Sequence, residues 1–233
     1  MPVASPVSDR LTVAALLMLT FATGLVDSIS VLVLGHVFVA NMTGNVIFLG
    51  FWFVPHSGVD LTAAAVAFVS FVTGAVIGGR LMRHLAGNVR RWLTVALGGE
   101  VVSLVVLAGL AGAGVLSYHG TGRLILIVGL ALVFGSQSVA ARQFGIQELS
   151  TTVLTATIVG IGMDSRLAGG SGHREKLRYA VVGTMCGGAV VGATLSRIVV
   201  APVIALAALS VAAGLAIFLS PGARRSSAPA GPA

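Results

Sequence analysis

Residues 74–81 read GAVIGGRL, and residues 188–195, which lie 114 positions later, read GAVVGATL. Five of the eight aligned positions are identical, and Ile77 against Val191 is a conservative difference. A second match has almost the same offset, 112, and pairs VANMTGNVIFLG at 39–50 with TTVLTATIVGIG at 151–162. Matches at a nearly constant offset indicate an old internal duplication.

The duplication predicts how the chain is organised. A first repeat covers residues 1–117 and a second covers residues 118–220, so the repeats meet near the middle of the chain. Residues 221–233 have the composition of a flexible tail, rich in Ser, Pro, Gly and Ala.

Composition defines the class of protein. Apolar residues make up 56% of the 233 positions, only 9% are charged, and the mean hydropathy is +1.02. Soluble domains carry roughly 25% charged residues, which this chain lacks. We therefore expect an all-α, polytopic membrane protein. The composition excludes a disordered chain, a coiled coil, a disulfide-rich secreted domain and an ordinary soluble enzyme.

The spacing of charges predicts about six net crossings. Four segments have the length of one crossing each: 61–83, 92–116, 177–197 and 198–220. Residues 11–54 and 122–163 are too long for one crossing and too short for three, because a crossing needs about 20 residues. Each should cross once and contain a broken or re-entrant helix. Each repeat then has three crossings, an odd number, so the second repeat is expected to be inverted relative to the first.

Basic residues indicate the orientation. The net charge is +7, and most of the Arg and Lys fall into four groups: Arg10; Arg80, Arg83, Arg90 and Arg91; Arg166, Arg174, Lys176 and Arg178; Arg224 and Arg225. By the positive-inside rule, these groups and both termini lie on the cytoplasmic side of the membrane, and the chain is expected to be a multi-pass protein of the bacterial inner (plasma) membrane. The positive charge is therefore explained by the lipid bilayer as partner, and we expect no nucleic-acid partner.

Two acids fall inside predicted crossings. Asp27 lies 16 residues after Leu11, where insertion of an acid costs about 2.5 to 3.5 kcal/mol. It is either a site for a proton or cation, or an acid that accepts hydrogen bonds from free backbone N–H groups at a helix break. Glu100 is a second candidate intramembrane acid with the same two interpretations.

Polar residues interrupt the two long regions at corresponding positions, which points to a midplane binding site. Alternatively, the hydroxyl groups bond only to their own helix, and Arg142 pairs with Glu148. The candidate substrate-binding or coupling residues are Asp27, Asn41, Thr43, Gly44 and Asn45 in the first region and Gln137, Ser138, Arg142, Thr151, Thr152 and Thr155 in the second.

The glycines of the repeated octapeptide have a simpler interpretation. Gly74 with Gly78, and Gly188 with Gly192, are small-xxx-small pairs that allow two helices to approach closely. We expect helix-packing contacts, either within the chain or in a homodimer.

The polar segments also carry a family resemblance. Gly24 to Gly50, with Asp27 and the run from Ala40 to Asn45, resembles the first conserved motif of the YoaK-like bacterial membrane proteins, known as domain of unknown function 1275. Phe134–Arg142 and Ser150–Thr157 resemble its second motif. Ser138 and Ala156 stand where the family usually has Asn and Gly, which weakens the case for an intact second half-site. The resemblance implies an integral inner-membrane protein of about six helices and supplies no substrate.

Three functions remain open. The leading hypothesis is a secondary transporter for an unknown small solute, with Asp27 binding the solute or coupling its movement to a proton or cation. The alternatives are a non-transporting membrane scaffold or regulatory subunit, and a passive channel. The chain has no His-Glu-x-x-His, Gly-x-Ser-x-Gly, phosphate-loop or cysteine-pair motif, so we expect no enzyme, no metal site and no cofactor.

Overall fold

The computed structural model describes residues 5–54, 58–144, 154–165, 168–170, 172 and 174–221, and within these residues the secondary structure is helical with no strand. The helices are α1 (Asp9–Leu32), α2 (Met42–Leu49), α3 (Leu61–His84), α4 (Val89–Gly112), α5 (Gly120–Gln143), α6 (Leu154–Met163), α7 (Glu175–Ser196) and α8 (Ala201–Leu219).

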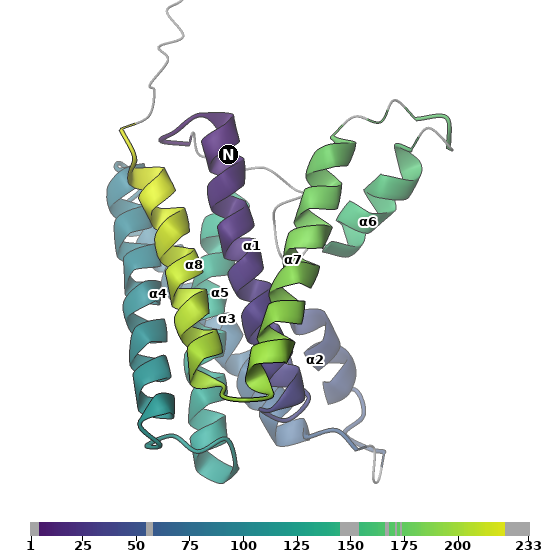
Figure 1. The fold of residues 1–233 in the computed structure, drawn as a ribbon, viewed down its shortest axis with the longest axis vertical. Helices are drawn as coiled ribbons and strands as arrows, with labels where there is room; N and C mark the ends of the chain where they lie inside the picture. The colour runs from purple at the N-terminus through teal and green to yellow at the C-terminus, as the bar shows by residue number, and fades with distance from the viewer. Residues whose placement is uncertain are drawn as a thin grey trace, which may run out of the picture.

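Six of these helices, α1, α3, α4, α5, α7 and α8, are long and apolar enough to cross a membrane. The two short helices follow α1 and α5, within the two regions that the sequence makes too long for one crossing. Figure 1 shows α2 and α6 beside the long helices and towards opposite ends of the bundle. The predicted all-α fold, with six candidate crossings and two shorter helical pieces, is confirmed.

Two helix starts are fixed by side-chain caps. The Asp60 carboxylate accepts a hydrogen bond from the Ala63 N–H at 2.9 Å, at the start of α3. The Asn88 amide oxygen accepts one from the Arg91 N–H at 3.0 Å, at the start of α4. Each cap satisfies a backbone N–H that has no partner within its helix.

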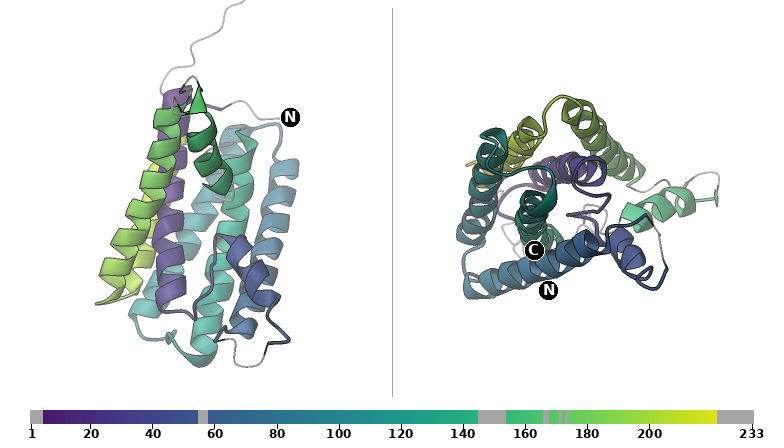
Figure 2. Two further views of the ribbon diagram at one scale, coloured as in Figure 1. Left: turned by 90° about the vertical axis from the view of Figure 1, so that its right-hand side faces the viewer. Right: turned by 90° about the horizontal axis from the view of Figure 1, so that it is seen from below.

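The bundle is built around α1 and α5, the two most buried of the six long helices. Helix α1 packs against α7 and α8, α5 packs against α3 and α4, and α4 also packs against α8. Seen along the bundle axis, α1 and α5 lie inside, and α2 and α6 project on one side (Figure 2). The short helices contact α3 and α7, respectively.

The crossing of α3 and α5 requires glycine. A Cβ atom on Gly74 would lie 2.0 Å from the Leu132 carbonyl oxygen, and one on Gly135 would lie 2.1 Å from the Phe71 carbonyl oxygen. A Cβ on Gly78 would lie 3.0 Å from the Cα of Ser136. No side chain fits at these distances, so the two backbones are in direct contact.

The crossing of α1 and α7 is built in the same way. A Cβ on Gly24 would lie 2.2 Å from the Met185 carbonyl oxygen, and one on Gly188 would lie 2.4 Å from the Phe21 carbonyl oxygen. On Gly192 it would lie 2.7 Å from the Leu25 carbonyl oxygen. Helices of the same chain therefore occupy the space beside all four glycines of the repeated motif, which leaves those surfaces unavailable to a second copy.

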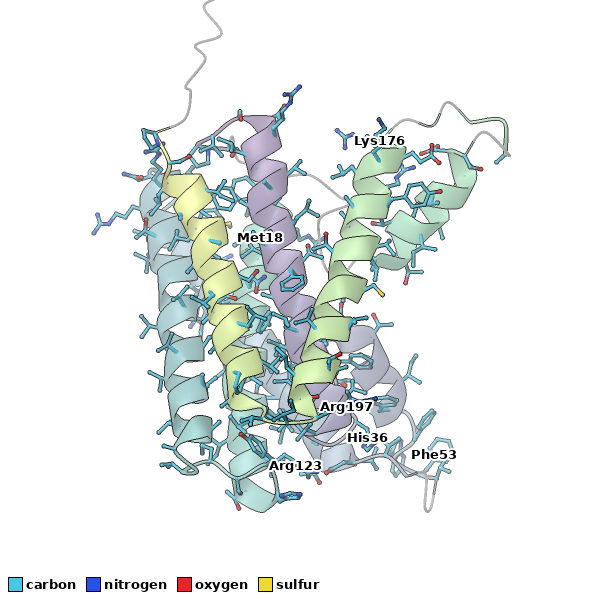
Figure 3. The ribbon with its side chains drawn as sticks, viewed as in Figure 1. Met18, His36, Phe53, Arg123, Lys176 and Arg197 are labelled. Carbon is cyan, nitrogen blue, oxygen red and sulfur yellow. The ribbon has the colours of Figure 1, made fainter. Side chains whose placement is uncertain are left out.

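The two ends of the bundle differ in charge. The start of α1 and the end of α8 lie at one end (Figure 1), as expected for an even number of long helices. Lys176 is at this end, whereas Arg123, Arg197, His36 and Phe53 are at the other (Figure 3). The first end also carries the basic groups at the α3–α4 connection and at the start of α7.

Candidate functional site

Asp27 holds a non-helical segment against α1. One carboxylate oxygen accepts hydrogen bonds from the backbone N–H groups of Val39 and Ala40, both at 2.9 Å. The other accepts a hydrogen bond from the Asn41 side-chain amide at 2.5 Å. The side chain is 6% exposed. Three donors thus surround one buried acid, as the second interpretation of Asp27 requires at a helix break.

The local chain path explains how these donors reach Asp27. After α1 ends at Leu32, the backbone reverses through Gly35 and His36, whose φ angles are 110° and 60°. A positive φ is easy for glycine and strained for most other residues. The chain then runs without helical hydrogen bonds to Asn41, and α2 begins at Met42. The N–H groups of this segment are therefore free to bond to Asp27.

Asn45 also holds the segment before α2 in place, through two hydrogen bonds to Phe38. Its amide oxygen accepts a hydrogen bond from the Phe38 N–H at 2.9 Å, and its amide nitrogen donates to the Phe38 carbonyl oxygen at 2.6 Å. Asn45 is fully buried. A Cβ atom on Gly44 would lie 2.5 Å from the Phe38 ring, so the aromatic ring covers this glycine. Asn45 and Gly44 therefore position the segment, and neither lines the cavities described next.

Two cavities adjoin the short helices. One, of about 500 Å³, lies between α1, the segment before α2, α6 and α7, and its wall includes Asp27, Asn41 and Met185. The other, of about 760 Å³, lies mainly along α6, and its wall also includes Asp164, just after that helix, and Arg178 of α7. Thr43 and Thr155 line both cavities. The two threonines, which the repeat aligns with each other, therefore stand where the cavities meet.

The site is not at mid-span of α1. Asp27 lies five residues before the last residue of α1, which corresponds to about 8 Å along the helix. The second cavity extends along α6 to Asp164, just after the end of that helix. The two cavities together thus extend over much of the length of the bundle, whereas the sequence suggested one midplane site.

An ion pair borders the second cavity. The Arg178 guanidinium donates to the Asp164 carboxylate at 2.5 Å and to the Gly160 carbonyl oxygen at 2.6 Å. The Arg178 side chain is 14% exposed and that of Asp164 is 44% exposed. These bonds join the last turn of α6 to α7. No sequence motif connects Asp164 with Arg178, although both lie beside the second polar region.

Three candidates on α5 lie away from both cavities. The Gln137 amide donates to the Leu19 carbonyl oxygen at 3.3 Å, and the Ser138 hydroxyl donates to the Phe134 carbonyl oxygen at 2.9 Å. Arg142 is in the last turn of α5. None of the three residues is on the wall of either cavity. Thr151, Thr152 and Glu148 lie outside the described residues.

Glu100 is separate from the cavities. It lies in α4 and is 5% exposed. Its Oε1 atom has no hydrogen-bond partner within the part of the chain that the structure describes. Neither cavity wall includes it. The two buried acids therefore belong to different parts of the bundle.

A second ion pair fixes the end of the bundle opposite the termini. Arg123, near the start of α5, donates to the Asp60 carboxylate, which also caps α3. Partial burial favours a higher pKa for Asp60, but the hydrogen bond from Ala63 and the Arg123 guanidinium outweigh it and hold the pKa below its ordinary value. This pair joins α3 to α5 beyond their glycine crossing.

No group of three or more His, Cys, Asp or Glu side chains with metal-site geometry is found among the described residues. The polar side chains on the wall of the first cavity are one carboxylate, one amide and three hydroxyls, and those of the second are two hydroxyls and the Asp164–Arg178 pair. Such groups can exchange hydrogen bonds with a small polar solute and carry no nucleophile paired with a base.

The fold and the site together define a polytopic helical membrane protein with two short helices beside a two-part, mainly apolar cavity that carries a few polar side chains. The chain belongs to the family described as "Protein of unknown function (DUF1275)", whose match covers residues 15–218. It is 37% identical over 156 residues to the UPF0700 transmembrane protein YoaK of Bacillus subtilis (strain 168), and the match covers 65% of each chain, slightly less than two thirds of the relative. No solved structure matches the chain.

Proposed function

We propose that this protein is a secondary transporter for a small polar solute, and that the solute passes through the two cavities that meet at Thr43 and Thr155. The observation that carries the proposal is the sharing of these two threonines by both cavities. Asp27 and Asn41 provide polar groups on one side of the threonines, and Arg178 and Asp164 provide them on the other. A solute could therefore exchange one set of hydrogen bonds for another as it moves.

The proposal includes two inverted repeats, α1 to α4 and α5 to α8. The glycine crossings support it, because the contacts of one crossing correspond to those of the other. Gly24 contacts Met185 and Ala189. Its counterpart Gly135 contacts Phe71 and Ala75, which lie 114 positions before Met185 and Ala189 and are therefore aligned with them in the repeat. Repeats of this kind allow a transporter to exchange inward-open and outward-open states by moving one part against the other.

The proposed orientation follows from the charged ends. The end of the bundle where α1 starts and α8 ends also carries most of the described Arg and Lys. By the positive-inside rule, this end faces the cytoplasm in the bacterial plasma membrane. The Asp27 cavity then lies towards the outside, and the Arg178 cavity lies towards the cytoplasm.

A labelling experiment tests this orientation and the inversion together. In a Cys186→Ala background, Ser117→Cys lies between α4 and α5, and Ala168→Cys lies between α6 and α7; both positions are exposed. An impermeant thiol reagent added to intact cells should label the first and spare the second until the membrane is opened. Labelling of both positions from the same side would contradict the inverted arrangement.

A non-transporting membrane scaffold is the second candidate, and the hydrogen bonds of Asp27 favour it. All three donors come from the adjacent segment, so Asp27 has a structural task whether or not a solute binds. In a scaffold, loss of a threonine hydroxyl from the cavity wall should have no effect on the binding or uptake of any solute.

The two candidates are separated at Thr43 and Thr155. Solutes are first found by their effect on the melting temperature of the purified protein, since a ligand of the folded state stabilises it. Uptake of a stabilising solute into proteoliposomes is then compared for wild type, Thr43→Val and Thr155→Val. Thr73→Val is the matched control, because Thr73 is exposed on α3 and bonds only to the Val69 carbonyl oxygen of its own helix.

Transport predicts saturable uptake that falls at least several-fold in Thr43→Val or Thr155→Val and stays unchanged in Thr73→Val. If no solute in a broad library of small polar molecules stabilises the protein or enters the vesicles, the transport proposal fails and the scaffold is favoured. Equal uptake by all four proteins would remove the two threonines from the pathway.

A further inference from the structure

Glu100 occupies the apolar middle of the bundle. It lies 11 residues after the first residue of α4 and 12 before the last, so it is about 17 Å along the helix from either end. Its neighbours on the same face, Leu97 and Leu104, are fully buried. Among the described helices, α4 packs against α8, α5 and α3.

No ionisable side chain on these neighbouring helices is placed to balance a charge at Glu100. Helix α8 contains none. The ionisable residues of the other helices are near the helix ends: Arg123 and Arg142 in α5, Arg80, Arg83 and His84 in α3, and Arg90 and Arg91 in α4 itself. The arginines of α4 precede Glu100 by nine and ten residues, or about 15 Å along the helix.

Hydrogen bonding does not compensate for a charge either. Oε1 of Glu100 is buried and without a partner in the described part of the chain, whereas Asp27 accepts three hydrogen bonds. A buried carboxylate needs a counter-charge or several donors to offset its lost hydration. A proton removes the charge itself, and it needs no cavity, which agrees with the absence of Glu100 from the walls of the two cavities.

We propose that Glu100 is a proton-binding site, occupied in this conformation, and that Glu100 rather than Asp27 is the residue that couples solute movement to protons. The coupling role rests on the proposed transport function, whereas proton binding does not. Asp27 then remains the acceptor for the segment before α2. Because Glu100 is 5% exposed, its proton is occluded here, and exchange with water requires another arrangement of α4 and its neighbours.

Infrared spectroscopy of the purified full-length protein tests proton binding directly. A protonated carboxyl group has a carbonyl stretch that a carboxylate lacks. We expect this band in the wild type at neutral pH, its loss in Glu100→Gln and its persistence in Asp27→Asn. A wild-type spectrum without the band, or a band lost in Asp27→Asn instead, would overturn the proposal.

A second variant covers the case in which Glu100→Gln fails to fold. Glu100→Asp keeps an acid but moves it by one methylene group, so the band should shift in frequency. An unshifted band would assign the proton to another residue and would equally overturn the proposal.

Proteoliposomes separate the coupling role from transport itself. With a solute that the wild type accumulates in response to a pH gradient, the ratio of uptake with the gradient to uptake without it should fall to about one in Glu100→Gln. A ratio that stays at the wild-type value would overturn coupling by Glu100. Absence of uptake by the wild type under every condition would refute the transport function, and the infrared result would still decide whether Glu100 binds a proton.

Discussion

Asp27 and Glu100 are both acids that lie within candidate membrane spans and are at least 94% buried, yet their surroundings are opposite. Asp27 accepts hydrogen bonds from two backbone N–H groups and one side-chain amide. Glu100 has an oxygen atom with no partner in the described part of the chain. Asp27 lies within α1 but faces a segment in which the chain has left the helix, whereas the helix around Glu100 is continuous.

The difference teaches that burial alone does not define the role of an intramembrane acid. Free backbone N–H groups are available in non-helical segments and in the first turn of a helix, because the rest of a helix uses its own N–H groups internally. Asp27 therefore satisfies donors that would otherwise be orphaned, and its removal harms the structure. Glu100 accepts no hydrogen bond at Oε1 from the residues that the structure describes, so its presence calls for a functional explanation.

Replacement of the two acids by apolar residues should give the largest contrast. Asp27→Ala leaves the N–H groups of Val39 and Ala40 and the amide of Asn41 without their acceptor. We expect a loss of about 3 to 5 kcal/mol in the free energy of unfolding. Glu100→Met should be neutral or stabilising, because it removes a buried polar group that has no partner.

Denaturant unfolding in mixed detergent micelles measures both free energies under the same conditions. A loss in Glu100→Met as large as that in Asp27→Ala would remove the distinction between the two acids.

The segment before α2 offers a test of intermediate size. Asn45→Ala leaves the Phe38 N–H and carbonyl groups unpaired, which should reduce the free energy of unfolding by about 1 to 3 kcal/mol. Ser138→Ala is the control, since the Ser138 hydroxyl bonds only to a carbonyl group of its own helix. The double variant Asp27→Ala/Asn45→Ala should lose less than the sum of the single losses, because both residues hold the same segment. Strict additivity would show that each residue stabilises the fold independently.

Asp60 is a third acid and lies at the boundary of the bundle. It should have the smallest effect of the three on the free energy of unfolding. Its pKa in the folded protein is held below the ordinary value of 3.8, chiefly by the Ala63 N–H and Arg123 bonds acting against partial burial. Its contribution is therefore complete above about pH 5 and is lost as the pH falls further, since the unfolded chain takes up the proton first. We expect the Asp60–Arg123 pair to contribute less than about 1 kcal/mol to the free energy of unfolding, because both side chains are partly exposed.

Asp60→Asn isolates this contribution, because asparagine caps a helix as well as aspartate does. Stability of the wild type and the variant should converge as the pH falls from about 5 to about 3. A difference that stays constant over this range would assign the effect of the substitution to something other than the charge.

Much of the fold was predictable because it depends on local composition. Apolar length predicts the six long helices, and the excess length of residues 11–54 and 122–163 predicts the two short ones. The glycine pairs predict close helix contacts without naming the partners, and only the structure shows that Gly74 faces α5 and Gly188 faces α1.

The candidate site was predictable in part. The structure brings Asp27, Asn41, Thr43 and Thr155 to the wall of one cavity, as the aligned polar motifs suggest. By contrast, Asn45 bonds to the backbone of Phe38. Gln137 bonds to the backbone of α1, and Ser138 bonds to the backbone of its own helix, α5. A motif gives the position of a side chain along the chain, but its direction depends on how each helix is rotated by its packing.

By itself, the sequence determined the class of protein, the number of long helices and the location of the polar interruptions, because hydrophobic length and charge act locally along the chain. Only the tertiary structure decided that Asp27 is surrounded by donors, that Oε1 of Glu100 has no partner among the described residues, and that Arg178 pairs with Asp164. Those environments are made by residues distant in sequence or beyond a break in the helix. The same acid can therefore be a structural acceptor in one part of the bundle and a proposed proton site in another.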